Sequence, residues 1–371
     1  MHLSFFSFLL LFLLCCHFFV YYFLVRLFNL SNKKLKLKLG LIITSILVGV
    51  IVTLYLFNIY DNSLIRIAYA IFASWMGIVI NIILLAFLLL FFKKIFTIFK
   101  IKIATIYFRY TFILLIVIIS IISFYRALSP TVSSYEVFVK DLPLAWENKT
   151  IVHISDLHLG PIYRANFLNR VVDRINLLEP EAVFISGDFF DGRRTDFSWL
   201  NHLLDAIITK KGIFYGFGNH DLYLGADKAK EIINSESLVI LDNKMLEVDG
   251  LQIIGLDYLS DISNTNGDLL KEVLEDNNYN ENQPSILIFH APLNIETFKE
   301  AKIDLQLSGH THDGQLFPFN YLVKLVHDGY GYGLFSEGDF NLIVSAGLGT
   351  WGPPMRTAHR SEIVEIVLRK K

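Results

Sequence analysis

The stretch Ile151-Val-His-Ile-Ser-Asp-Leu-His-Leu-Gly160 decides the fold of this chain. Its first half is a short apolar run, which is typical of a strand buried on both faces. Its second half places Asp156 and His158 directly after that run. A spacing of two residues puts both side chains on one side of an extended backbone, so both can reach one ion. His153 points to the face opposite Ile154, and we interpret it as structural.

The same kind of run recurs along the next 150 or so residues and predicts further strands. Tyr135–Lys140 alternates like a half-buried strand, and Asn166–Leu178 has the apolar spacing of an amphipathic helix. Strands that alternate with helices indicate an α/β domain. The remaining predicted strands, after Ile151–Ser155, are Ala182–Ser186, Ile213–Gly216, Ile286–Phe289 and Leu305–Ser308.

Polar side chains follow each of these runs at the point where the strand is expected to end. The carboxyl ends of strands are where ligand-binding residues gather in α/β sheets. The residues in these positions are Asp156, His158, Asp188, Asn219, His220, Asp221, His290, His310 and His312.

Seven of these residues form a donor set of imidazole nitrogens with carboxylate and amide oxygens, and the set contains no thiolate. Such a set suits Zn, Fe or Mn better than Ca or Mg. Seven donors are too many for one tetrahedral ion and suit two ions that share a bridging carboxylate. Two ions about 3.5–4 Å apart can hold a hydroxide and clamp a phosphoryl group. The predicted metal ligands are Asp156, His158, Asp188, Asn219, His290, His310 and His312.

The order of these motifs resembles that of the calcineurin-like metallophosphoesterase family. The resemblance covers roughly residues 135–371 and includes Gly187-Asp188, Gly218-Asn-His-Asp221 and Gly309-His-Thr-His312. Gly314-Gln315 and the segment that ends at Arg356 are similar to a bacterial branch of secreted or membrane-anchored phosphodiesterases. Many members of that branch have Gly where this chain has Asp313.

The resemblance implies a four-layer α/β sandwich, in which helices flank two mixed sheets, with two divalent metal ions. The first ion would be held by Asp156, His158, Asp188 and His312, and the second by Asp188, Asn219, His290 and His310. Asp188 would bridge the two ions. His220 would act as proton donor or charge stabiliser at the leaving group, with Asp221 orienting it. Asp191 could orient a ligand or cap a helix or turn, and Arg356 could contact phosphate or form a salt bridge.

The first third of the chain has the composition of a membrane domain. The whole chain is 53% apolar and only 18% charged, against about 25% charged residues in an average soluble domain. A helix needs about 20 apolar residues to cross the hydrocarbon core. The predicted spans are 3–25, 39–60, 67–92 and 105–125. The last has only 16 uncharged residues between Arg109 and Arg126. It would cross the membrane if both arginines snorkel to the interfaces or if the helix begins near Ile103.

The charges in the connections between the spans predict the orientation of the chain. Lys33, Lys34, Lys36 and Lys38 lie in the first connection, and Lys93, Lys94, Lys100 and Lys102 in the third. By the positive-inside rule both connections are cytoplasmic, which places both termini and the catalytic domain outside the cytoplasm. If the fourth segment does not cross, the domain faces the cytoplasm instead.

The predicted organisation is a transmembrane domain over 1–126, a linker over 127–134 and a metallophosphoesterase domain over 135–371. Residues 1–126 carry a net charge of +11, so the remainder carries −13 in a chain of net charge −2. An acidic domain repels polyanions, so no nucleic-acid partner is expected. The two cysteines, Cys15 and Cys16, lie in an apolar run and cannot form a metal site in the acidic part.

The sequence thus predicts a multi-pass membrane phosphoesterase whose substrate is a phosphomonoester or phosphodiester, with a lipid or envelope headgroup as an attractive class and the bilayer as a partner. One alternative is a cytoplasm-facing pyrophosphate hydrolase of a nucleotide-linked lipid precursor of the UDP-diacylglucosamine type. Another is a catalytically silent metal-binding sensor.

Overall fold

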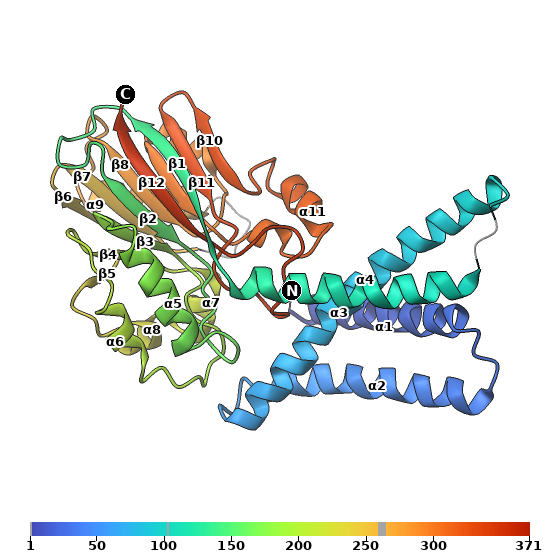
Figure 1. Cartoon of the computed structure of the whole chain (residues 1–371). Helices are drawn as coiled ribbons and strands as arrows, with labels where there is room; N and C mark the ends of the chain where they lie inside the picture. Colours follow the sequence, from blue (N-terminus) through green and yellow to red (C-terminus); the bar gives the residue numbers. More distant parts are fainter. Residues whose placement is uncertain (1, 102–103, 259–264) are drawn as a thin grey trace. The chain divides into compact units, whose positions relative to one another are not determined.

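The computed structural model describes residues 2–101, 104–258 and 265–371. The chain divides into two compact units. One is formed by Met1–Tyr125 with the short segment Gly352–Met355, and the other by Arg126–Trp351 with Arg356–Lys371. Figure 1 shows the elements of both units.

The described residues of the first unit form four helices that are long and apolar enough to cross a membrane. Asn32 and Asn62 cap the second and third helices through side-chain oxygens that accept from the amides of Lys34 and Ile65. The predicted start of the fourth span near Ile103 falls outside the described residues, and the helix is described from Thr105. The helices are α1 (His2–Leu27), α2 (Lys33–Leu56), α3 (Ser63–Ile98) and α4 (Thr105–Leu128).

The second unit is an α/β sandwich of two six-stranded mixed sheets. The first sheet has the order β1-β12-β2-β3-β4-β5, and the second has the order β10-β11-β9-β8-β7-β6. The first sheet consists of β1 (Thr131–Val139), β2 (Thr150–Ile154), β3 (Ala182–Ser186), β4 (Ile213–Gly216), β5 (Leu238–Ile240) and β12 (Glu362–Lys370). The second consists of β6 (Lys244–Val248), β7 (Leu251–Leu256), β8 (Ser285–Phe289), β9 (Leu305–Ser308), β10 (Gly333–Glu337) and β11 (Phe340–Val344).

Helices cover the outer face of each sheet and complete four layers. Ile151 of β2 packs into the core between the sheets, whereas its neighbour Val152 packs into the core under the helices, as a strand buried on both faces requires. The helices over the first sheet are α5 (Ala165–Asn176), α6 (Leu200–Leu204), α7 (Asn219–Leu224) and α8 (Ala226–Ile232). Those packed on the second are α9 (Thr265–Asp276) and α10 (Ile295–Glu300).

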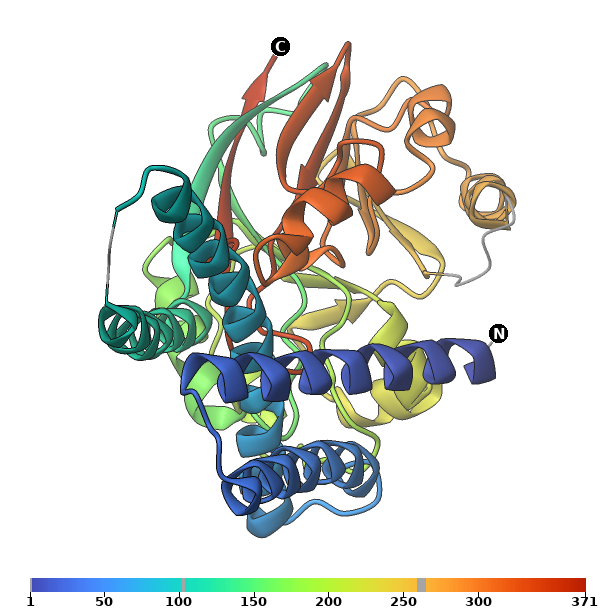
Figure 2. The ribbon, with the colours of Figure 1, turned by 90° about the vertical axis from the view of Figure 1, so that its right-hand side faces the viewer.

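Two short elements lie outside these layers, one beginning at the last predicted ligand, His312, and one after it. They are the 3-10 turn η1 (His312–Gly314) and the helix α11 (Phe319–Val326). In the view of Figure 2, α11 (in orange) lies on the surface of the second unit, in front of the sheets.

The segment 127–134, predicted as a linker, contains the end of one helix and the start of one strand. Helix α4 runs to Leu128 and β1 begins at Thr131, so only two residues separate them. The serines that suggested a loop are strand residues whose hydroxyls bond the neighbouring strand: Ser133 donates to Glu362, and Ser134 donates to Glu365. Polar side chains on an edge strand are compatible with a sheet when a partner strand satisfies them.

Candidate metal centre

The predicted ligands lie in the loops that follow β2, β3, β4, β8 and β9. Because these five strands end at the same edge of the sandwich, residues from five separate stretches of chain come together there. Six of the seven predicted ligands form two clusters, in each of which the donor atoms lie within 4.8 Å of one another, and His158 also forms a third such group with Asp191 and His220.

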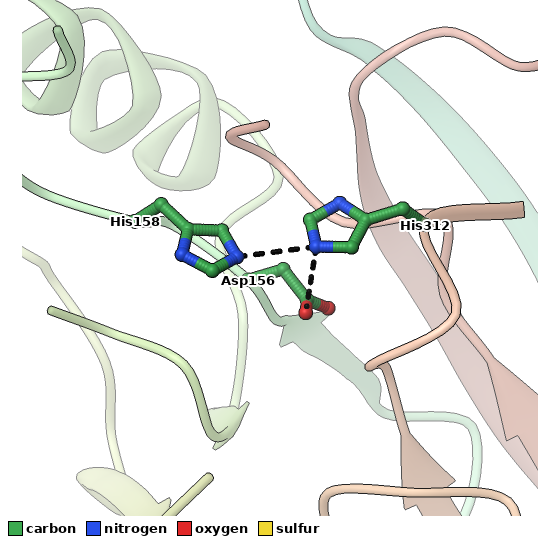
Figure 3. Close-up of side chains that lie close together, drawn as sticks. All are labelled: Asp156, His158 and His312. Atoms are coloured by element: carbon green, nitrogen blue, oxygen red, sulfur yellow. Dashed lines mark hydrogen bonds and ion pairs between the residues drawn. The ribbon is translucent and has the colours of Figure 1, made fainter. Parts of the chain in front are cut away.

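The first cluster consists of Asp156, His158 and His312, whose donor atoms converge in Figure 3. His158 Nε2 lies 3.1 Å from His312 Nε2, and His312 Nε2 lies 3.3 Å from Asp156 Oδ1. All three residues are buried.

The second cluster consists of Asp188, His290 and His310. His290 Nε2 lies 3.2 Å from Asp188 Oδ2 and 3.2 Å from His310 Nδ1. The other nitrogen of His290, Nδ1, donates to the carbonyl of Ser186 over 2.7 Å, which fixes the ring and leaves Nε2 as the atom that faces the cluster.

Asp188 connects the two clusters. Its Oδ2 lies 3.9 Å from His158 Nε2 in the first cluster, in addition to its contact with His290 in the second. Its Oδ1 accepts a hydrogen bond of 2.8 Å from the backbone amide of His220. Asn219, the seventh predicted ligand, begins α7, and its buried Oδ1 has no hydrogen-bond partner among the residues that the structure describes.

The geometry of both clusters fits metal ions. Two donor atoms bound about 2.1 Å from one ion lie about 3.0–3.4 Å apart, which matches the 3.1–3.3 Å separations within the clusters. A buried amide oxygen without a partner is costly, and coordination would satisfy Asn219 Oδ1. Nitrogen and oxygen donors without sulfur suit Zn, Fe or Mn.

The protonation of the histidines is also compatible with cation binding. Burial lowers the pKa of His158 to about 4 and that of His310 to about 3, so both rings are neutral at pH 7 and offer a lone pair. Burial alone would also lower the pKa of His290, but the Asp188 carboxylate outweighs it and raises that pKa to about 9. The carboxylates of the site therefore favour positive charge at this position.

The backbone at five of the ligands has a left-handed conformation. The φ angles are 51° at Asp156, 46° at His158, 51° at Asp188, 69° at His310 and 50° at His312. Non-glycine residues rarely adopt such angles, and they concentrate at functional sites. Glycines leave room beside the carboxylates: a Cβ on Gly218 would lie 2.3 Å from Asp188 Oδ1, and one on Gly309 would lie 2.2 Å from Asp156 Oδ2.

His220 contacts the first cluster through the ring of His158. Its ring is perpendicular to that of His158, with 4.7 Å between centroids, and its side chain is 18% exposed. Burial lowers the pKa of His220, but the carboxylates of Asp188 and Asp191 outweigh this effect and raise the pKa to about 9. The ring is therefore protonated at neutral pH.

Asp221, which was predicted to orient His220, makes its hydrogen bonds to backbone amides. Asp221 is fully buried, and its carboxylate accepts backbone amides of Phe189, Phe190 and Gly218, so it holds two strand-end loops together. The carboxylate beside the His220 ring is Asp191, with Oδ1 3.6 Å from Nδ1. Its place three residues after Asp188 was visible in the sequence, but spacing alone did not distinguish an orienting role from a cap.

Arg356, for which a phosphate contact or a salt bridge was considered, makes hydrogen bonds to backbone carbonyls. It is fully buried and donates to the carbonyls of His312, Gly347 and Gly349, at 3.3, 3.2 and 2.6 Å. It therefore fixes the loop that carries His312 against the loop after β11. A lone arginine in a loop gives no sequence signal for such a position.

Comparisons with known proteins identify the family. A family model described as calcineurin-like phosphoesterase matches residues 149–314. The chain is 32% identical over 276 residues to an uncharacterised metallophosphoesterase of Campylobacter jejuni, and the alignment covers 71% of each protein. The chain belongs to the calcineurin-like metallophosphoesterase family. It is thus a phosphoester hydrolase, in a family that typically depends on two metal ions.

Another relative of this metallophosphoesterase is named as a transmembrane protein. The chain is 31% identical over 279 residues to a zebrafish (Danio rerio) "transmembrane protein with metallophosphoesterase domain", an alignment that covers 71% of this chain and 63% of the relative. A solved structure of a dimetal phosphatase from the same organism matches 60% of this chain and 93% of its own, with 12% identity and a TM-score of 0.37. The four apolar helices and the transmembrane relative associate this metallophosphoesterase with a membrane.

Proposed function

We propose that this chain is a multi-pass membrane enzyme that hydrolyses a phosphomonoester or phosphodiester with a pair of divalent metal ions. One ion is held by Asp156, His158, Asp188 and His312, and the other by Asp188, Asn219, His290 and His310. The observation that supports this assignment most is that Asp188 lies within 4 Å of histidines of both clusters. A carboxylate in that position can serve both ions at once.

The residues around the clusters have separate tasks in the proposed reaction. When bound, two cations lower the pKa of water and polarise the phosphoryl oxygens. His220 lies next to His158 and beside the carboxylate of Asp191, so it is positioned to donate a proton to the oxygen of the leaving group. Asp191 holds the His220 ring in place, and Asp221 fixes the loops that present Asp188 and Asn219.

We infer the substrate class from the membrane anchor. An enzyme attached to a bilayer meets phosphoesters of lipid or envelope headgroups at high local concentration, and the net charge of −13 outside residues 1–126 disfavours nucleic acid. The basic connections support a catalytic unit outside the cytoplasm. If it faced the cytoplasm, the pyrophosphate of a nucleotide-linked lipid precursor would be the substrate instead.

The experiment that tests the function uses the full chain purified in detergent and loaded with Mn²⁺. Turnover is measured on an aryl phosphodiester, an aryl phosphomonoester and DNA. We expect turnover of at least one aryl ester and little of DNA. His220→Ala should reduce ester turnover about 10²- to 10⁴-fold, because the proton donor is lost.

The matched control is His202→Ala, since His202 is an exposed histidine of α6 outside the site. It should leave turnover and metal content unchanged. A metal-loaded chain that hydrolyses no ester would contradict the proposal and favour a catalytically silent sensor. Mass analysis of lipids extracted after incubation with active and His220→Ala protein would identify the headgroup.

A further inference from the structure

Helix α11 and its flanks carry an apolar surface that the described residues of the second unit leave exposed. Every residue of α11, all of which the structure describes, is partly or fully exposed. Among the large apolar residues of α11 and its flanks that are exposed, the exposed fraction ranges from 46% for Phe317, which precedes the helix, to 78% for Leu325. A contiguous exposed surface of this kind marks an interaction site. This apolar patch consists of Phe317, Tyr321, Leu322, Leu325, Val326 and Trp351.

The patch is continuous because its members are held together. Tyr321 and Leu325 are four residues apart and share one side of α11. The ring of Phe317 packs edge-on against that of Tyr321, with 6.0 Å between centroids. Gln315, two residues before Phe317, ties Trp351 to this region through two hydrogen bonds to its backbone, at 3.2 and 3.0 Å.

The patch is also connected to the end of a helix that is suited to cross a membrane. Arg126, in the last turn of α4, donates to the carbonyls of Thr357 and Ala358, both at 3.1 Å. The amides of Thr357 and Ala358 donate to the carbonyl of Gln315, and Thr357 Oγ1 accepts from the amide of Phe317 at 2.8 Å. All of these residues belong to the second unit. Hydrogen bonds through Thr357 and Ala358 therefore link the end of α4 to the segment that precedes α11.

These hydrogen bonds connect the patch to a helix that is suited to cross a membrane, so a bilayer is the surface we consider for the patch. We propose that α11 inserts the apolar patch into the interface of the same bilayer that holds α1–α4. Tyr321 and Trp351 are amphipathic aromatic residues of the kind enriched at that depth. Lys324, an exposed cation on the same helix, would face anionic headgroups.

Insertion would bring the metal centre to the lipid surface. α11 follows η1, which contains His312, and the ring of His327 just after α11 lies 6.1 Å from that of His310. Thr311, between the two ligands, donates to the carbonyl of Gly331 at 2.7 Å. Insertion of α11 determines where the enzyme binds rather than what it hydrolyses, so it is tested by a measurement other than ester turnover.

The test places an environment-sensitive NBD label on the patch in the full chain. Cys15 and Cys16, the two cysteines, are first replaced by alanine. Leu325→Cys is then labelled and the protein reconstituted in phosphatidylcholine/phosphatidylglycerol vesicles, with or without nitroxide-labelled lipid. We expect a blue-shifted emission that nitroxide lipid reduces about twofold or more, as for an interfacial helix. Leu322→Cys is a second probe on the same helix.

The control is Leu177→Cys, because Leu177 is an equally apolar residue with 81% exposure, located after α5. Its emission should stay water-like and be insensitive to nitroxide lipid. Equal, water-like emission at positions 325 and 177 would overturn the proposal. A label at 325 that is shielded but not quenched by lipid, together with a disulfide between unlabelled Leu325→Cys copies, would also overturn it and assign the patch to contact between two copies.

Discussion

At the scale of single residues, two neighbouring carboxylates have different environments and therefore different tasks. Asp191 lies beside the imidazole of His220, whereas the carboxylate of Asp221 accepts three backbone amides. A carboxylate that accepts several backbone N–H groups is a structural element of the loops it joins. Asp191 can act on the protonation and orientation of His220 without supporting the fold.

We therefore predict that Asp191→Asn lowers ester turnover about 10- to 100-fold, as for loss of an orienting carboxylate. Bound metal and the melting temperature should stay unchanged, because Asp191 holds no loop together through its carboxylate. Turnover, metal content and thermal melting of the full chain in detergent measure the three quantities.

Asp221→Asn is the contrasting variant for this prediction. An amide has one acceptor oxygen in place of two, so at least one buried backbone N–H loses its partner, at a cost of about 1–3 kcal/mol. This variant should melt at a lower temperature. A loss of stability in Asp191→Asn equal to that in Asp221→Asn would contradict the assignment of the two roles.

At the scale of secondary-structure elements, the strands were predictable and the loops between them only in part. Ala182–Ser186, Ile213–Gly216 and Leu305–Ser308 are confirmed to the residue, because short runs that are largely apolar are typical of strands buried on both faces. The start of β1 could not be predicted, because serines such as Ser133 and Ser134 are typical of loops. They form a strand here because they pair with β12, which lies over 220 residues later in the chain.

The ligand positions after each strand followed from the same pattern, but their geometry did not. The left-handed backbone at Asp156 and His158 and the close approach of Gly309 to Asp156 depend on contacts between loops that are distant in sequence. The pairing of His220 with Asp191 depends on how the loop after β3 meets α7. Such local strain is stabilised by the surrounding structure, so local sequence preferences cannot predict it.

Strand β2 also contains a buried histidine that makes stability depend on pH. His153 was predicted to be structural, and its Nε2 lies 2.7 Å from the hydroxyl of Ser186, away from the clusters. Burial lowers its pKa from 6.5 to about 3 in the folded state. The unfolded chain therefore binds more protons between these pH values. The stability that this histidine contributes is present above pH 6.5 and is lost as the pH falls towards 3.

We predict that His153→Gln reduces the sensitivity of the fold to acid, because glutamine keeps a hydrogen bond to Ser186 but does not titrate. One proton corresponds to about 1.4 kcal/mol per pH unit, or about 2 kcal/mol between pH 6.5 and 5. The drop in melting temperature from pH 7 to pH 5 should be about 5 °C smaller in the variant than in the unaltered chain. An equal drop in both proteins would contradict a neutral buried His153.

At the scale of the whole molecule, the charge distribution sets the predicted orientation. Residues 1–126 contain eight lysines, four arginines and one acid, with the lysines grouped at the first and third connections. In the structure, α2 begins with two of these lysines, and α3 continues through Lys93 and Lys94 to Ile98. Basic residues at helix ends favour the cytoplasmic side. Four crossings would place the catalytic unit on the opposite side.

Cysteine labelling in intact cells tests this orientation. In a chain without Cys15 and Cys16, we expect a membrane-impermeant maleimide to label Ile208→Cys, an exposed position in the second unit, without permeabilisation. Ser31→Cys, an exposed position between α1 and α2, should be labelled only after permeabilisation. The reverse pattern would place the catalytic unit in the cytoplasm and favour the nucleotide-linked lipid precursor.

The central claim is that two metal ions share the carboxylate of Asp188 in a cage built from five loops. Elemental analysis of the purified full chain after reconstitution with Mn²⁺ or Zn²⁺ tests it most directly. We predict two equivalents of metal for each chain, and close to none for Asp188→Asn, because that residue serves both ions. One equivalent or fewer in the unaltered chain, or two equivalents retained in Asp188→Asn, would contradict the claim.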